Sequence, residues 1–176
     1  MLGKIAGIYY NDTAAAPGFC VSVYVSGCDL HCKGCHNPQA QSFDYGEELT
    51  EELIQKIILA LNANGVMRKL CILGGEPLHP MNVPMTEYLI KRCKEVFHNL
   101  EIYIWSGYDY KILKNRKECN YILNTATCLI DGLFIEELRD ITLPMRGSSN
   151  QNIIMLKENE YKILCWRSLY WARGVS

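Results

Sequence analysis

Short strands that alternate with helices are the feature that most constrains the fold of this chain. Four runs are rich in β-branched and aromatic residues, which is typical of strands. They cover residues 19–26, 69–73, 101–105 and 127–131. Between them, apolar spacing and capping residues predict helices over 50–64, 84–98 and 109–117. This alternation predicts βαβ units and a parallel sheet.

The helix that follows Thr50 has the clearest pattern. Thr50 can cap its first turn, and Asn64 with Gly65 marks its end. Its apolar residues share one face at helical spacing, namely Leu53, Ile54, Ile57, Ile58 and Leu61. Two late runs, 152–156 and 161–166, are extended in character, and the sequence does not place them in the sheet.

At 176 residues, the chain is shorter than the roughly 200 residues of the smallest complete (β/α)₈ barrels. We therefore expect an α/β fold built as an open, partial (β/α) barrel, with residues 1–176 forming a single domain. Ligands bind at the carboxyl ends of strands in such sheets. The cysteine-rich loop after the first strand should then share one mouth with Gly74, Gly75 and Glu76 after the second strand and with Ser106 and Gly107 after the third.

That loop carries Cys28, Cys32 and Cys35 in a C-x3-C-x2-C spacing. Thiolates hold iron–sulfur clusters, and three of them would hold three corners of a four-iron cube. The fourth iron would stay open to an outside ligand, as reactive chemistry requires. A structural zinc site is the alternative, with a fourth ligand from His31, His36 or Cys20. The chain has no second C-x2-C pair, which favours iron.

The other six cysteines are scattered along the chain. An odd total of nine cannot pair completely, and a reducing compartment disfavours structural disulfides. We expect most of them to be small buried hydrophobic residues. They are Cys20, Cys71, Cys93, Cys119, Cys128 and Cys165.

Composition excludes several classes of partner. The net charge is −1 and lysine and arginine do not cluster, so we expect no nucleic-acid surface. No apolar run reaches the length that spans a membrane. The first residues lack the charged and then apolar layout of a signal peptide. We therefore expect a cytoplasmic protein without membrane contact.

The cysteine loop, together with the sequence GGEP at 74–77, resembles the radical S-adenosylmethionine superfamily. Further motifs narrow this resemblance to one subgroup, and they lie at 105–108 (WSGY), 130–134 (IDGLF) and 146–151 (RGSSNQ). The set is similar to the anaerobic ribonucleotide reductase activating proteins and extends from about residue 18 to residue 151. The loop at 13–18 departs from the subgroup's pattern, and the tail after Gln151 is longer than expected.

The resemblance implies a glycyl-radical-generating enzyme of the radical S-adenosylmethionine type. Its [4Fe–4S] cluster would cleave S-adenosylmethionine reductively to methionine and a 5′-deoxyadenosyl radical. That radical would abstract a hydrogen atom from a glycine of the anaerobic ribonucleoside-triphosphate reductase. An electron donor such as flavodoxin or ferredoxin would reduce the cluster. The cofactor carries the chemistry, so no side chain is expected to be catalytic.

The same resemblance suggests which residues bind the cofactors. Cys28, Cys32 and Cys35 would hold the cluster. Gly74 and Gly75 would let the backbone approach S-adenosylmethionine, because no Cβ stands in the way. The Glu76 carboxylate would meet the methionyl amine in a charge-assisted contact. Ser106 could meet the methionyl carboxylate, but a hydroxyl at a strand end is more often a turn or cap residue. Many superfamily members place an adenine-contacting aromatic residue just before the third cysteine. Gly34 occupies that position here, and His36 follows the cysteine.

The remaining polar residues carry weaker predictions. Asp131 lies at another strand end, where a structural role as a turn residue is about as good an interpretation as a functional role. Three residues of the late motif could contact the partner protein or the cofactor, namely Arg146, Asn150 and Gln151. His31 and His79 are expected to be surface or structural residues.

Three alternatives remain at this stage. The nearest is an activase of another glycyl radical enzyme such as pyruvate formate-lyase, although those chains are usually longer and several carry extra clusters. A radical enzyme acting on a small molecule, such as one making a deazapurine precursor, is the second. The third is a zinc-stabilised binding module without catalysis, which would be colourless where an iron–sulfur protein is brown.

Overall fold

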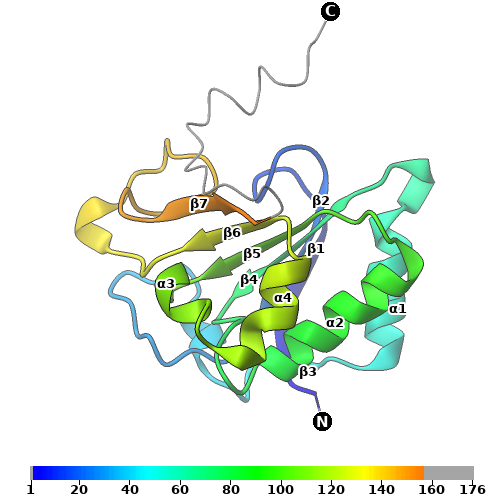
Figure 1. Ribbon diagram of the computed structural model, residues 1–176, viewed down its shortest axis with the longest axis horizontal. Helices are drawn as coiled ribbons and strands as arrows, with labels where there is room; N and C mark the ends of the chain where they lie inside the picture. The colour runs from blue at the N-terminus through cyan, green and yellow to red at the C-terminus, as the bar shows by residue number, and fades with distance from the viewer. Residues whose placement is uncertain (1, 157–176) are drawn as a thin grey trace, which may run out of the picture.

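The computed structural model describes residues 2–156, which form one seven-stranded sheet in the order β3-β1-β2-β4-β5-β6-β7 (Figure 1). The strands are β1 (Lys4–Asp12), β2 (Cys20–Val25), β3 (Glu47–Glu48), β4 (Lys69–Gly74), β5 (Ile102–Ser106), β6 (Cys128–Asp131) and β7 (Asn152–Met155). The α-helices are α1 (Glu51–Leu61), α2 (Val83–Val96), α3 (Tyr110–Leu113) and α4 (Asn120–Thr125). Short 3₁₀ turns cover Pro38–Gln41, Ala63–Gly65, Lys117–Cys119 and Glu136–Leu138. The mixed α/β class is confirmed.

The centre of the sheet is parallel, as the alternation of strands and helices predicts. Strands β2, β4, β5 and β6 run in one direction, with Val25 opposite Gly74 and Ser106 opposite Asp131. Strands β1 and β7 are antiparallel to their neighbours. Within the described part of the chain the sheet is not closed, because β3 and β7 form its two edges.

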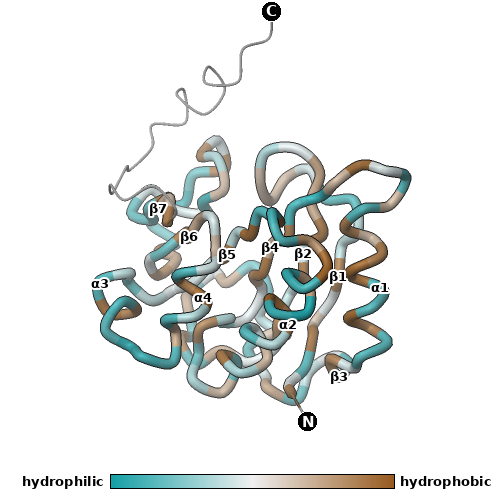
Figure 2. Tube along the Cα trace, turned by 45° about the vertical axis from the view of Figure 1, so that its right-hand side comes forward, coloured by the Kyte–Doolittle hydropathy of each residue, from teal (hydrophilic) through white to brown (hydrophobic). Residues whose placement is uncertain are grey.

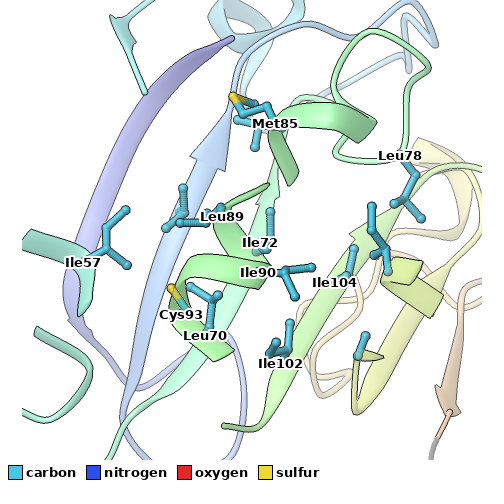
Figure 3. Close-up of a cluster of buried hydrophobic side chains, with 14 of the residues drawn as sticks. Ile57, Leu70, Ile72, Leu78, Met85, Leu89, Ile90, Cys93, Ile102 and Ile104 are labelled. Carbon is cyan, nitrogen blue, oxygen red and sulfur yellow. The ribbon is translucent and has the colours of Figure 1, made fainter. Parts of the chain in front are cut away.

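One face of the sheet is covered by helices and holds the main core. Figure 1 shows α1, α2 and α4 in front of the strands. In Figure 3, side chains of α2 such as Leu89 and Ile90 lie over Ile72 and Ile102 of the sheet. The five apolar residues predicted on one face of α1 are all buried, and Figure 2 shows α1 alternating between hydrophobic and hydrophilic residues. The Thr50 hydroxyl caps this helix by accepting a 3.3 Å hydrogen bond from the Leu53 amide.

The opposite face of the sheet holds a second, smaller core under loops instead of helices. Ala16 from the β1–β2 loop is buried there, and Met145 from the loop before β7 packs against the same cluster. Three cysteines contribute to it, namely Cys20, Cys71 and Cys128. Cys93 and Cys119 are buried in the main core. The prediction of buried cysteines is thus confirmed for five of the six, and Cys165 lies outside the described residues.

Local patterns predicted most elements but not all. The helix predicted over 109–117 is wrong in length, because α3 ends at Leu113 and the chain is extended at Arg116. Asn115 contributes to this end, since its side-chain amide donates a 2.8 Å hydrogen bond to the Lys111 carbonyl. Neither α4 nor β1 was predicted, and β1 is mostly half-exposed and contains Gly7, which weakens its strand pattern.

The two late extended runs have different outcomes. Residues 152–156 include the edge strand β7, whereas 161–166 lie outside the described residues. None of the helices in residues 2–156 combines the length and the apolar character that crossing a bilayer requires.

Candidate functional site

A cavity of about 240 Å³ lies at the carboxyl ends of the parallel strands. The thiols of Cys28, Cys32 and Cys35 line it from the loop after β2. The turns after the next three strands complete the wall with Gly74, Gly75, Ser106, Gly107 and Gly132. The expectation that these loops share one mouth is therefore confirmed for the three cysteines, Gly74, Gly75, Ser106 and Gly107, but not for Glu76. Two residues predicted to bind the cofactor, Gly34 and Glu76, are not among those that line the cavity.

The cysteine loop is held in a folded-back conformation by backbone hydrogen bonds. Gly27 has a left-handed φ of 99°, and its amide donates to the Ala40 carbonyl at 2.8 Å. The Cys28 amide donates to Gln41 at 3.0 Å, and the Cys35 amide donates to the Cys32 carbonyl at 3.2 Å. The bonds of Gly27 and Cys28 hold the start of the loop against the 3₁₀ turn at Pro38–Gln41. All three thiols are thereby presented on one wall, each half-buried.

The chemistry of these thiols suits an iron–sulfur cluster. Burial raises the pKa of the Cys28 thiol to about 11 and also raises that of Cys32. Metal binding must therefore displace protons, because only thiolates are ligands. In residues 2–156, no group of three or more His, Cys, Asp or Glu side chains converges as the ligands of one metal ion would. All three thiols do line the same cavity, and thiolates are the usual ligands of iron–sulfur clusters.

Gly74, the last residue of β4, and Gly75, which follows it, allow the turn to pack closely against the end of β2. Gly74 has a left-handed φ of 109°, which favours glycine. A Cβ on Gly75 would lie 2.7 Å from the Gly27 carbonyl oxygen and 2.8 Å from that of Ala40. Both are backbone atoms that cannot move aside cheaply. The backbone of this turn thus packs directly against the cysteine loop, and the same two glycines line the cavity.

The Glu76 carboxylate lies inside the protein, where it is 1% exposed. One of its oxygens, Oε1, accepts hydrogen bonds from the Leu78 amide at 2.9 Å and the Ser106 hydroxyl at 2.8 Å. The other, Oε2, accepts one from the Gly107 amide at 2.7 Å. Burial raises its pKa to about 7, although these donors act in the opposite direction. The sequence-based interpretation directs this carboxylate at a cofactor amine, whereas here its partners are protein groups.

Gly34 lies against the segment that follows β6. A Cβ there would be 2.6 Å from Oε1 of Glu136, and the residue has a left-handed φ of 68°. The neighbouring Lys33 forms ion pairs with Glu136 at 3.1 Å and with Glu137 at 3.2 Å. Residues 33 and 34 of the cysteine loop are thus in contact with the side chains of Glu136 and Glu137, and the left-handed φ favours glycine at position 34.

An aromatic and sulfur-containing wall completes the cavity. Of its residues only His36 is predicted to bind a cofactor, although Trp105 and Phe134 belong to the motifs at 105–108 and 130–134. His36 and Phe134 both line the cavity, and their ring centroids are 5.1 Å apart at an interplanar angle of 53°. Trp105 and Met145 lie beside them, joined by a 2.7 Å hydrogen bond from the Trp105 indole to the Met145 carbonyl. Strand alternation placed Trp105 at the last position of its run, but no local signal points to Met145.

Residues of the late motif organise the loop before β7. The Gln151 side chain accepts from the Gly147 amide at 2.8 Å and donates to the Gly132 carbonyl at 2.8 Å. Arg146 donates to the Gln151 carbonyl at 3.1 Å, and Asn150 donates to Leu133 at 2.8 Å. Gln151 also lines the cavity. These contacts fold the loop over the aromatic wall.

Other polar residues have local partners. Asp131 accepts a 2.7 Å hydrogen bond from the Tyr110 amide and a 2.9 Å bond from Asn152, as expected of a turn residue. His31 lies 3.3 Å from the side-chain oxygen of Gln41. His79 lies 3.3 Å from the Asp29 carboxylate.

A second, wider cavity of about 660 Å³ adjoins the first. The two cavities share Tyr24, His36, Leu73, Trp105 and Met145. The outer walls of the second cavity come from the β1–β2 loop and from residues 143–146. The second cavity therefore lies next to the thiol-lined cavity, on the side of the aromatic wall.

Comparison with known proteins agrees with this geometry. Residues 14–154 match a family model described as a 4Fe-4S single cluster domain. Anaerobic ribonucleoside-triphosphate reductase-activating proteins are similar along most of their length. The protein of Salmonella typhi is 35% identical over 150 residues, which is 85% of this chain and 96% of the relative. That of Vibrio cholerae serotype O1 is 36% identical over 82% of this chain and 93% of the relative.

A more distant relative has the same name. The activating protein of enterobacteria phage T4 is 29% identical over 83% of this chain and 90% of its own length. The chain therefore belongs to the 4Fe-4S single cluster domain family and, within it, to the anaerobic ribonucleoside-triphosphate reductase-activating proteins.

Proposed function

We propose that this protein activates an anaerobic ribonucleoside-triphosphate reductase by generating a glycyl radical on it. The observation that carries the proposal is the arrangement of Cys28, Cys32 and Cys35 on one wall of a cavity whose other walls are glycine turns. Three thiolates can hold three corners of a [4Fe–4S] cluster and leave one iron open. The names of the relatives supply the target of the activation.

S-adenosylmethionine is the second cofactor of the proposal. When bound together, the cluster and S-adenosylmethionine supply one-electron cleavage of the sulfonium and hydrogen abstraction by the resulting 5′-deoxyadenosyl group. The protein's own contribution is binding and orientation. Gly74 and Gly75 line the end of the cavity where we place the methionyl group, whereas the Ser106 hydroxyl donates to Glu76 and is not free to donate to a ligand. His36 and Phe134 form an aromatic end suited to a purine.

The open sheet suits a protein substrate. We infer that it forms a partial barrel of the radical S-adenosylmethionine type, with all of residues 1–176 in a single domain. The wider cavity shares five lining residues with the thiol-lined cavity, and we infer that a protein substrate would approach from that side. A glycine carried on a loop has no side chain to obstruct such an approach.

The proposal extends to further partners. An electron donor such as flavodoxin or ferredoxin would reduce the cluster, and the reaction would take place in the cytoplasm. Neither nucleic acid nor a membrane has a role in it. The formal net charge of −1 and the absence of a basic cluster in the sequence are consistent with this.

The test is to mix the iron-loaded, reduced protein with S-adenosylmethionine and an anaerobic ribonucleoside-triphosphate reductase. Electron paramagnetic resonance should then show a glycyl radical on the reductase, and omitting S-adenosylmethionine should abolish it. The control partner is pyruvate formate-lyase, which should remain without a radical. An intact cluster that yields no radical on the reductase would overturn the proposal. A radical on pyruvate formate-lyase alone would favour the alternative activase.

The zinc-stabilised module has its own test. Protein purified anaerobically should be brown and should bleach in air, because iron–sulfur clusters absorb visible light and react with oxygen. Colourless protein that contains zinc and no iron would favour the binding module.

A further inference from the structure

Asn82 lies between the glycine turn and α2. Sequence reasoning placed a helix start here, and asparagine is a favoured residue at the first helical boundary. Its side chain nevertheless makes no capping hydrogen bond to the helix. The residue is 3% exposed, so its amide needs partners inside the protein.

Those partners are backbone carbonyls of two separate loops. The Asn82 side-chain amide donates to Ser26 and to Gly27, each at 3.0 Å, at the entrance of the cysteine loop. It also donates to the Glu76 carbonyl at 2.9 Å, in the glycine turn. One buried amide nitrogen therefore joins the loop that carries the thiols to the turn that faces them.

Backbone hydrogen bonds support the same junction. The Gly75 amide donates to Val25 at 2.7 Å, and the Glu76 amide donates to Gly27 at 2.9 Å. The Gly27 carbonyl thus accepts from both Glu76 and Asn82. Because Gly75 leaves no room for a Cβ against Gly27, the loop and the turn are in direct contact at this point.

The carboxylate of Glu76 extends the junction to the next strand. It accepts from Ser106 and Gly107 after β5, while the backbone carbonyl of the same residue accepts from Asn82. The ends of β2, β4 and β5 are thereby connected through two buried polar side chains. Cys28 follows Gly27 directly, so its position depends on this connection.

We propose that Asn82 is a positioning residue that fixes the entrance of the cysteine loop against the glycine turn and so sets the width of the thiol-lined cavity. Asn82 itself is not among the residues that line the cavity. It acts through Gly27 and Glu76, whose neighbours Cys28 and Gly75 form facing parts of the wall. The effect on S-adenosylmethionine rests on the proposed function, whereas the effect on the loop does not.

The first measurement addresses the loop alone, in metal-free protein. Asn82→Leu keeps a similar volume but donates no hydrogen bond, and the carboxylate of Asn82→Asp keeps the shape but can only accept, so it would face three carbonyl oxygens without a donor. Amide hydrogen exchange at Gly27 and Cys28 should be at least about tenfold faster in both variants. Exchange equal to that of the unsubstituted protein in both variants would overturn the proposal.

Thr86→Val is the matched control. The Thr86 hydroxyl is buried in the first turn of α2 and donates its 2.9 Å hydrogen bond to the Pro77 carbonyl of the glycine turn instead of to the cysteine loop. It should leave exchange at Gly27 and Cys28 unchanged. If Thr86→Val accelerated this exchange as much as Asn82→Leu, a general loss of stability would explain the result and the proposal would fail. If Asn82→Leu does not fold, Asn82→Asp is compared with Thr86→Val.

The second measurement uses iron-loaded full-length protein. The concentration of S-adenosylmethionine that half-changes the electron paramagnetic resonance spectrum of the reduced cluster should rise by about tenfold or more in Asn82→Leu, at unchanged iron content. Thr86→Val should titrate like the unsubstituted protein. An unchanged titration in Asn82→Leu would contradict the effect on the cavity. Failure of the unsubstituted protein to load iron or to respond would instead overturn the proposed function, and the exchange measurement would still decide the role of Asn82.

Discussion

The Glu76 carboxylate and the Gly107 amide are joined by a 2.7 Å hydrogen bond in the interior of the protein. Glu76 belongs to the turn after β4 and Gly107 to the turn after β5, two neighbouring parallel strands. The same carboxylate accepts from the Ser106 hydroxyl. A buried acidic group therefore holds together two turns that line the candidate site.

This burial predicts a specific dependence of stability on pH. The pKa of Glu76 is raised to about 7 in the folded protein, compared with about 4.3 in an unfolded chain. Between these values the folded state holds a proton that the unfolded state has released. The free energy of unfolding of metal-free protein should therefore fall as the pH rises from about 4.3 to 7, by up to about 4 kcal/mol.

Denaturant unfolding at a series of pH values measures this effect. Glu76→Gln cannot ionise, so its stability profile should lack this fall. Glu137→Gln is the control, because Glu137 is exposed and its pKa is lowered, mainly by a backbone hydrogen bond and by Lys33. Parallel profiles for Glu76→Gln and the unsubstituted protein would show that Glu76 does not titrate in this range.

Gly75→Ala should disrupt the junction between the glycine turn and the cysteine loop. The added Cβ would lie 2.7 Å from the Gly27 oxygen and 2.8 Å from that of Ala40, both in the backbone. We expect a loss of about 1–3 kcal/mol in the free energy of unfolding, as for other overpacked sites. Gly7→Ala is the matched control, because nothing lies within 4 Å of its added Cβ. Equal stability of the two variants would contradict the close approach.

Cys32→Ala should abolish the iron–sulfur cluster, because two thiolates cannot hold three of its corners. After anaerobic reconstitution, unsubstituted protein should contain about four irons per chain, and Cys32→Ala should contain almost none. Cys93→Ala removes a thiol from the main core and should load iron normally. Iron and sulfide analysis with visible absorption makes the comparison. Equal iron in both variants would exclude Cys32 as a ligand.

Trp105→Phe should loosen the loop that covers the aromatic wall. It removes the 2.7 Å hydrogen bond to the Met145 carbonyl, where the backbone has a left-handed φ of 60°. We expect a loss of about 1 kcal/mol and faster amide hydrogen exchange over residues 143–147. Tyr103→Phe is the control, because its hydroxyl contacts Lys69 and Glu101 and not this loop. Unchanged exchange in Trp105→Phe would show that the indole does not hold the loop.

Local sequence patterns were sufficient wherever the controlling interactions are local. The face of α1 and its Thr50 cap depend on spacing within one helix. The strands β2, β4, β5 and β6 lie within two residues of their predicted bounds, because each is a compact apolar run. The spacing of Cys28, Cys32 and Cys35 likewise indicated a cluster-binding loop, since three ligands in one short loop need no distant partner.

The sequence by itself thus determined the parallel centre of the sheet, the cysteine loop and the order of the turns around it. Only the tertiary structure decided the partners of Glu76 and Asn82, the contact of Gly34 with Glu136, and the aromatic wall formed by His36 and Phe134. These contacts join residues that are far apart in the chain. A periodic pattern records which face of an element is buried, but it does not record which distant polar group satisfies a buried donor or acceptor.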